Sequence, residues 1–463
     1  MSTTKPRPVF SSFRDPSGFV FQKDGLIYRQ VNPCYQAEYD HFVRSGLFRL
    51  LLEKGYLIEH EEVKESQKGA YKILKARPLP FVSYPYEWSF HQYQDAALLT
   101  LQIEELALSK GMSLKDASAY NIQFTDGRPV LIDLLSFQRY QENQPWVAYR
   151  QFCQHFLAPL ALMAYQDLRL GQLLSVYLDG IPLDLATSLL PWRTRLVSGL
   201  ATHLHLHAWV QKKKMQSKEN TKTSYQLSQK GLLGIVDSLR STILGLKLSR
   251  KQSIWSDYYQ KTNYTPRAFQ KKKQIIARWL AQLRPKRVWD VGANTGYFSR
   301  VALMHSDLIV ATDSDPLAVD YCYEETKSKK EPSLLPLVVD LVNPSPAIGW
   351  QNKERLSFLE RAQFDLTMAL ALIHHLVIGD NLPFSYLASL FAQTSRFLII
   401  EFVPKEDSNA QRLLRDREDT FPYYTEKQFV EDFKVHFQIK EKVSIGESKR
   451  VLYLMERKGG SAV

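Results

Sequence analysis

The fold of this chain is decided by one stretch, Arg287-Val-Trp-Asp-Val-Gly-Ala-Asn-Thr-Gly-Tyr-Phe-Ser299. Its first residues predict a buried strand, and the pair Gly292 and Gly296 predicts a tight turn that leads into a helix. Glycine permits a positive φ angle and lets a ligand approach the backbone closely. A second apolar run, residues 308–313, predicts a strand that ends on Asp313. This carboxylate comes about 20 residues after the turn, where Rossmann-type sites hold a ribose diol. Together these features predict a nucleotide-binding turn in a doubly wound α/β sheet.

From about residue 256 to 458 the chain resembles the class I S-adenosylmethionine-dependent methyltransferases. The first motif of that family falls here on Asp290, Gly292, Asn294 and Gly296, with Asn294 in place of the usual central glycine. Asn is the non-glycine residue that best tolerates a left-handed backbone, so this departure leaves the turn possible. The resemblance implies a Rossmann-like fold, S-adenosyl-L-methionine as the cofactor and methyl transfer as the activity.

The rest of the predicted sheet comes from apolar runs of strand length, at residues 333–340, 364–373 and 396–403. A parallel sheet that is buried on both faces requires such runs. Residues 437–443 and 448–455 predict a closing hairpin. By the family resemblance, Asp313 takes the ribose hydroxyls, Asp340 takes the adenine amino group, and residues 369–371, beginning with Ala369, line the cofactor.

His374 and His375 follow the fourth predicted strand and are candidate catalytic residues. A histidine can act as general base on a hydroxyl or amine, because its pKa lies near neutral pH. The alternative is a structural histidine at the start of a helix. Glu401 leaves the fifth strand and is a further candidate for substrate contact.

The methyl acceptor is not defined by these residues. The first motif is similar to that of sugar and natural-product O-methyltransferases, which favours O- or N-methylation of a small molecule or glycan. The whole layout is similar to bacterial proteins related to nodulation methyltransferases.

The N-terminal part of the chain carries a second pattern. Asp116 and Asn121 are separated by four residues, and Asp133 follows at the end of an apolar strand. This order resembles the catalytic and metal-binding loops of the protein-kinase-like fold, particularly its small-molecule kinases. The resemblance implies that Asp116 orients or deprotonates a hydroxyl, while Asn121 and Asp133 hold Mg²⁺ against the phosphates of ATP. It also places Arg29 where this fold keeps a phosphate-binding lysine, and Glu38 where a helix carries the partner of that lysine.

The same region departs from the kinase pattern at several positions. Leu114 stands in place of the loop histidine, no glycine follows Leu134, and Gly18 is alone where a glycine-rich loop is expected. An arginine also presents its charge differently from a lysine. Two interpretations therefore stay open for this domain: a bifunctional phosphotransferase and methyltransferase, or a domain that only binds nucleotide or substrate.

The composition and charge of the 463 residues limit the possible partners. A formal net charge of +12 favours an anionic partner, which keeps an RNA-directed methyltransferase with an N-terminal binding module as an alternative. Basic runs at residues 212–222 and 271–273 are interpreted as solvated and account for part of this charge. No stretch has the roughly 18 uninterrupted apolar residues of a membrane span, and no signal peptide is apparent. We therefore expect a cytoplasmic protein.

The sequence predicts four parts: a kinase-like α+β domain at residues 1–195, a helical and basic linker at 196–255, a methyltransferase domain at 256–458 and a disordered tail at 459–463. An aromatic cluster surrounds the start of the third part. By resemblance to the N-terminal extensions of methyltransferases, this cluster closes over the cofactor or receives the substrate. Its members are Trp255, Tyr258, Tyr259 and Tyr264.

Overall fold

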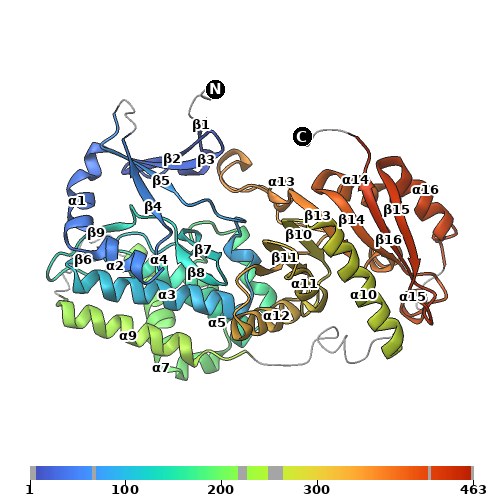
Figure 1. Ribbon diagram of the computed structural model, residues 1–463. Helices are drawn as coiled ribbons and strands as arrows, with labels where there is room; N and C mark the ends of the chain where they lie inside the picture. The colour runs from blue at the N-terminus through green and yellow to red at the C-terminus, as the bar shows by residue number, and fades with distance from the viewer. Residues whose placement is uncertain (1–6, 65–68, 217–226, 249–263, 416–418, 460–463) are drawn as a thin grey trace. The chain divides into compact units, whose positions relative to one another are not determined.

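The computed structural model describes residues 7–64, 69–216, 227–248, 264–415 and 419–459 (Figure 1). The chain divides into two compact units. The first unit contains residues up to 250 together with 347–356, and the second contains residues 251–346 and 357–463. Several predictions concern residues outside the described ranges: the lysines Lys218 and Lys222, the aromatic residues Trp255, Tyr258 and Tyr259, and the tail from residue 460.

The first unit begins with an antiparallel sheet of five strands in the order β1-β2-β3-β5-β4. Positive φ angles at Asp24 (49°) and Gly25 (77°) close the two-residue turn between β2 and β3, which form a hairpin. The strands are β1 (Arg7–Pro8), β2 (Gly18–Lys23), β3 (Leu26–Val31), β4 (His60–Val63) and β5 (Lys72–Ala76).

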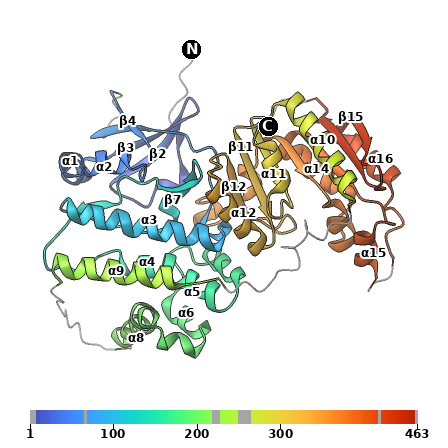
Figure 2. The same cartoon turned by 60° about the horizontal axis from the view of Figure 1, so that its bottom comes forward.

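A helical part follows this sheet and is built around α3 (Phe90–Ser109). In Figure 2, α9 (Gln229–Gly245) runs alongside α3. The Gln94 side chain donates to the carbonyl of Ile243 at 2.8 Å, and Gln229 donates to the carbonyl of Leu108 at 2.7 Å. The described part of the predicted helical linker at residues 196–255 is helical, and it belongs to the first unit, on which α9 packs.

The remaining elements of the first unit are short. Its small antiparallel pairs are β6 (Met112–Leu114) with β9 (Phe137–Arg139), and β7 (Ile122–Thr125) with β8 (Arg128–Leu131). Its other α-helices are α1 (Gln36–Arg44), α2 (Leu47–Glu53), α4 (Tyr149–Phe152), α5 (Ala158–Tyr165), α6 (Leu183–Leu189), α7 (Ser198–Leu200) and α8 (His207–Gln216).

Residues 347–356 join the first unit although they lie between two strands of the second. Arg14 Nη2 donates to the buried carboxylate of Glu354 at 2.7 Å, and the hydroxyl of Tyr84 accepts from the backbone N–H of Leu356 at 3.0 Å. The guanidinium of Arg355 stacks 4.6 Å from the ring centroid of Tyr120. The continuous domain predicted over residues 256–458 is therefore interrupted by a segment that folds with the N-terminal unit.

The second unit is a seven-stranded sheet in the order β12-β11-β10-β13-β14-β16-β15. The five neighbouring strands β12, β11, β10, β13 and β14 are parallel. Strand β16 is antiparallel to both of its neighbours, β14 and β15. The chain starts at β10 in the middle, builds outward to β12 and then returns to the other side of β10 with β13. The predicted doubly wound sheet and its closing hairpin are confirmed. The strands are β10 (Arg287–Val291), β11 (Leu308–Asp313), β12 (Leu334–Val338), β13 (Phe364–Ala369), β14 (Ser395–Phe402), β15 (Phe437–Ser444) and β16 (Val451–Arg457).

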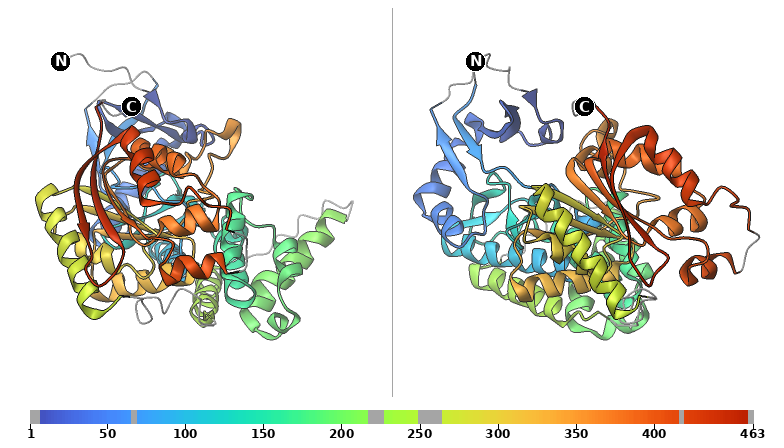
Figure 3. Two further views of the ribbon diagram at one scale, coloured as in Figure 1. Left: turned by 90° about the vertical axis from the view of Figure 1, so that its right-hand side faces the viewer. Right: turned by 45° about the vertical axis from the view of Figure 1, so that its right-hand side comes forward.

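Helices cover both faces of this sheet (Figure 3). Side chains of α10 (Pro266–Leu283), such as Ile276 and Trp279, pack with Ile399 of β14 on one face. Phe402, an odd number of residues further along β14, contacts Phe429 of α16 on the other face, at 5.3 Å between ring centroids. The remaining helices of the unit are α11 (Tyr297–Ala302), α12 (Pro316–Lys329), α13 (Phe358–Arg361), α14 (Phe384–Thr394), α15 (Ser408–Leu414) and α16 (Glu426–His436).

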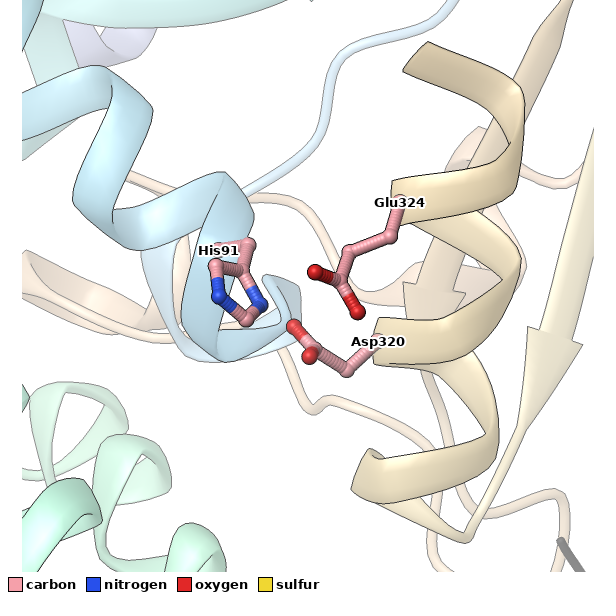
Figure 4. Close-up of side chains that lie close together, drawn as sticks. All are labelled: His91, Asp320 and Glu324. Carbon is pink, nitrogen blue, oxygen red and sulfur yellow. The ribbon is translucent and has the colours of Figure 1, made fainter. Parts of the chain in front are cut away.

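Among the described residues, no helix combines the length and the apolar character needed to cross a membrane. On α12, the carboxylates of Asp320 and Glu324 lie on successive turns and point to the same side of the helix (Figure 4). Neither residue lines the cavity described next.

Candidate active site

A cavity of about 210 Å³ lies in the second unit at the carboxyl ends of β10, β11, β12 and β13. In open α/β sheets, ligands bind at this edge where the strand order reverses. Five of the predicted cofactor-binding residues line the cavity, namely Asp290, Gly292, Asn294, Asp313 and Asp340. The other two lie beside it: Gly296 precedes the first turn of α11, and Ala369 is buried at the end of β13, directly before lining residues 370–372.

The glycine turn has the left-handed geometry that its sequence predicts. The φ angles are 68° at Gly292, 52° at Asn294 and 80° at Gly296. The backbone N–H of Asn294 donates to Asp313 Oδ2 at 2.8 Å, which ties the turn to the neighbouring strand. A Cβ atom on Gly296 would come within 2.5 Å of the Sγ atom of Cys322. Glycine is therefore required at position 296, whereas asparagine satisfies position 294.

Burial raises the pKa values of the two carboxylates nearest the turn, Asp290 and Asp313. Burial raises the pKa of Asp290 to about 7, although the Ser299 hydroxyl, which donates to Oδ2 at 2.6 Å, offsets part of the shift. Burial also raises the pKa of Asp313 to about 6, against hydrogen bonds from the N–H groups of Asp315 and Asn294. Asp340 is exposed, and its Oδ1 accepts from the N–H of Val342 at 2.9 Å. Asp290, Asp313 and Asp340 thus form a row across three adjacent strands.

The two candidate catalytic histidines differ in their access to the cavity. His375 lines it, and burial together with the charge of Arg450 lowers the pKa of His375 to about 4. His374 is fully buried and does not line the cavity; within the described ranges, both of its ring nitrogens lack a hydrogen-bond partner. Only His375 is placed to meet a molecule in this cavity.

A buried charged network borders the cavity, which two of its members, Tyr264 and Lys272, line, and this network was not predicted. Lys272 Nζ lies 2.6 Å from Glu401 Oε2 and 3.2 Å from the hydroxyl of Tyr264. The same hydroxyl donates to Glu401 and accepts from Arg450 Nη1, the latter at 2.8 Å. Arg450 continues to Asp407 through two hydrogen bonds of 2.7 and 2.9 Å. We call Tyr264, Lys272, Glu401 and Arg450 the buried network.

The basic run at residues 271–273 was interpreted as solvated, and this is wrong for its middle residue. Lys272 is 2% exposed. Its place is set by the period of α10, because Ala268, Lys272, Ile276 and Trp279 share the buried face of that helix. The helical spacing of the apolar neighbours is the sequence signal that would have identified it.

Four of the five predicted N-terminal site residues are brought together, and Glu38 is not. Burial and then the charge of Asp133 raise the pKa of Asp116, to which Asn121 donates a hydrogen bond. Arg29 Nη2 lies 2.6 Å from Asp133 Oδ1 and 3.4 Å from Asp15 Oδ2. Asp116 accepts from the side chain of Gln151 at 2.8 Å, and Asn121 donates to the hydroxyl of Ser136 at 3.2 Å.

Glu38 does not pair with Arg29, contrary to what the resemblance implies. Its two oxygens accept from the backbone N–H and the Nε of Arg139, at 2.6 and 3.0 Å. Arg29 instead forms an ion pair with Asp133, the residue predicted to bind Mg²⁺ with Asn121. Because Arg29 lies 2.6 Å from the Asp133 carboxylate, this side chain does not fit a metal ligand.

Comparisons with known proteins define the family. The chain is 35% identical to nodulation protein NoeA of Rhizobium meliloti (strain 1021), over 98% of this chain and 97% of that protein. The chain therefore belongs to the NoeA family of nodulation proteins. No protein-family model matches it.

Among solved structures, the chain is similar to methyltransferases. The sequence identities and the TM-scores of these matches are low. N-methyltransferase NodS from Bradyrhizobium japonicum WM9 is 12% identical, with 42% of this chain and 98% of NodS covered and a TM-score of 0.32. Magnesium protoporphyrin IX methyltransferase (ChlM) from Synechocystis PCC 6803 is 16% identical, with 44% and 92% covered and a TM-score of 0.32. The bifunctional kinase-methyltransferase WbdD is 19% identical, with 41% and 38% covered and a TM-score of 0.27.

Proposed function

We propose that the second unit binds S-adenosyl-L-methionine and transfers its methyl group to an oxygen or nitrogen of a small-molecule or glycan acceptor. One observation carries the proposal. The left-handed glycine turn, Asp313 and Asp340 come from three successive strands and line one cavity at the point where the strand order reverses. This is the arrangement that a long, polar nucleoside cofactor needs.

Each of these groups has a chemical role toward such a cofactor. Asp313 Oδ1 and Oδ2 each accept one backbone N–H and keep a lone pair for the two ribose hydroxyls. Asp340 lines the cavity and would accept from the adenine amino group. The carboxylates that line the cavity favour the positive sulfonium, because opposite charges attract strongly where water is excluded. These are Asp290, Asp313, Asp340 and Asp380.

Methyl transfer requires little covalent chemistry from the protein. The cofactor, when bound, supplies a carbon whose leaving group is a neutral thioether, so the chain mainly has to align the acceptor and exclude water. His375 is neutral at pH 7 and is placed to take the proton that the acceptor loses. Because its pKa is about 4, it is a weak base, and alignment contributes more than proton transfer.

A labelled-methyl assay tests this function. The full chain is incubated with methyl-labelled cofactor and, in parallel, with small-molecule, glycan and RNA fractions. We expect label in the small-molecule or glycan fraction, abolished or strongly reduced in Asp313→Ala but kept in Asp307→Ala, whose exposed side chain precedes the other end of β11. Label in RNA alone would support the RNA-directed alternative, and no label in any fraction would contradict methyl transfer.

For the first unit we propose a binding role rather than phosphotransfer. Asp116, Asn121 and Asp133 lie in one polar cluster that is compatible with a nucleotide or a part of the substrate. Arg29 already neutralises Asp133 at 2.6 Å, so a ligand here does not need Mg²⁺ to offset that carboxylate. Mg²⁺-dependent ATP consumption that is lost in Asp116→Ala would instead establish a bifunctional enzyme.

A further inference from the structure

Acidic side chains outnumber basic ones on the wall of the cavity. Four aspartates line it, whereas Lys272 is the one positively charged side chain among the described residues that do so, His375 being neutral. S-adenosylmethionine carries two cationic groups, the sulfonium and the α-ammonium, and one anionic group, the α-carboxylate. The carboxylate is the part of the cofactor that the aspartates repel, so it needs the single cation.

The position of Lys272 fits the amino-acid end of the cofactor. The proposed function places adenine at β12, through Asp340, and ribose at β11, through Asp313. In the strand order, β13 and β14 lie beyond β10 on the side away from β12, so residues there would meet the amino-acid end of a cofactor held in this way. Lys272 lies on this side, since it pairs with Glu401 of β14 and its ammonium is 4.7 Å from the ring centroid of Phe298, just after the glycine turn.

The ammonium of Lys272 also has an N–H donor available for this contact. A lysine ammonium has three N–H donors. One is directed to Glu401 and one to Tyr264, and the described part of the chain holds no further hydrogen-bond partner for the third. Burial lowers the pKa of Lys272, but Glu401 at 2.6 Å favours its charged form. Burial alone would raise the pKa of Glu401, yet the charges of Lys272 and Arg450 hold it below its ordinary value.

We infer that Lys272 binds the α-carboxylate of S-adenosylmethionine and that Glu401 and Tyr264 hold its ammonium in position for this contact. This inference rests on the proposed function, since it assigns one group of the same cofactor. It distinguishes Lys272 from Lys271 and Lys273, the neighbouring lysines of the same run. Lys271 and Lys273 do not line the cavity.

Equilibrium binding of two ligands tests the inference. S-adenosylhomocysteine has the carboxylate, whereas 5′-methylthioadenosine keeps the adenosine and sulfur but lacks the amino-acid end. In Lys272→Met we expect the Kd of S-adenosylhomocysteine to rise roughly 10- to 150-fold, the range for one lost hydrogen bond to a charged group. The Kd of 5′-methylthioadenosine should change by less than about threefold, and Lys273→Met should leave both ligands unaffected.

Because Lys272→Met leaves Glu401 buried without its ammonium partner, the double variant Lys272→Met/Glu401→Gln is measured in parallel and should give the same selective loss. An equal weakening of both ligands, or no weakening of S-adenosylhomocysteine, would overturn the assignment of Lys272. Failure of the unaltered protein to bind either ligand would overturn the proposed function itself, so the two failures are distinguishable.

Discussion

Removal of Glu401 should destabilise the second unit and leave the first unchanged. Glu401 is fully buried and bonds to Lys272 at 2.6 Å and to the Tyr264 hydroxyl, with Arg450 Nη1 at 3.7 Å. In Glu401→Ala, Lys272 loses its counter-charge inside the protein, whereas Arg450 keeps Asp407. Removing one partner of a buried ion pair costs about 3–5 kcal/mol, because a charge is left unpaired.

A matched control comes from the same helix. Arg278 of α10 pairs with Glu441 of β15 at the same distance of 2.6 Å, but Arg278 is 52% exposed. Exposed ion pairs contribute about 0–1 kcal/mol, so Glu441→Ala should have little effect. The double variant Lys272→Met/Glu401→Leu should lose less stability than Glu401→Ala, since neither charge then stays buried alone.

Two buried cysteines allow each unit to be measured separately. Cys153 is buried in the first unit and Cys322 in the second, and both are free thiols. A thiol reagent modifies them only when the surrounding structure opens, so the labelling rate reports the local free energy of opening. The predicted cost for Glu401→Ala corresponds to labelling of Cys322 that is roughly 150- to 5,000-fold faster. The Cys153 rate should not change.

The outcome that refutes this reasoning is specific. If Glu401→Ala accelerates the labelling of Cys322 no more than Glu441→Ala does, then water reaches the buried network and its charges are not desolvated. If the labelling of Cys153 is accelerated as much as that of Cys322, the destabilisation is not confined to the second unit.

Three further predictions concern the turn, the carboxylates and the first unit. Gly296→Ala should accelerate Cys322 labelling. The double variant Gly296→Ala/Cys322→Ala should recover part of the thermal stability, because the 2.5 Å clash with Cys322 is removed, whereas the left-handed strain of about 1–2 kcal/mol and the 3.0 Å approach to Arg300 Nη1 persist. Cofactor affinity measured by calorimetry should fall as the pH drops through about 7 and then 6, because the ionised carboxylates bind the cofactor and protonation of Asp290, whose pKa is about 7, and of Asp313, whose pKa is about 6, competes; Asp313→Asn should remove the lower of the two steps. In thermal-shift measurements, any ATP stabilisation of the first unit should not depend on Mg²⁺, and a Mg²⁺-dependent shift that Asp133→Asn abolishes would contradict the role given to Arg29.

The sequence was sufficient to predict those features whose sequence pattern lies within one short segment. The strands of the second unit are continuous apolar runs, and the glycine turn carries its own backbone requirement, so both were predicted together with the carboxylates that end β11 and follow β12. Gly292 and Asp313 lie 21 residues apart in sequence (313 minus 292) and meet because adjacent parallel strands bring their carboxyl ends together. This is a rule of the fold that needs no side-chain detail.

The buried network could not be predicted in the same way. Lys272 and Glu401 are separated by 129 residues, and their pairing depends on how α10 packs over the sheet. A run of three lysines is usually solvated, and only the helical period of its neighbours distinguishes the middle one. The pairing of Glu38 with Arg139, 101 residues away, and the transfer of residues 347–356 to the first unit are likewise tertiary events without a local sequence signal.

Titration calorimetry of S-adenosylmethionine tests the central claim most directly. The unaltered chain should bind one cofactor per chain. Asp313→Ala should weaken this binding by about 1–3 kcal/mol, or roughly 5- to 150-fold in Kd, because the charged hydrogen bonds to the ribose are lost. Asp307→Ala should bind as the unaltered chain does. Unchanged affinity in Asp313→Ala, or no binding by the unaltered chain at millimolar cofactor, would contradict the assignment of this cavity.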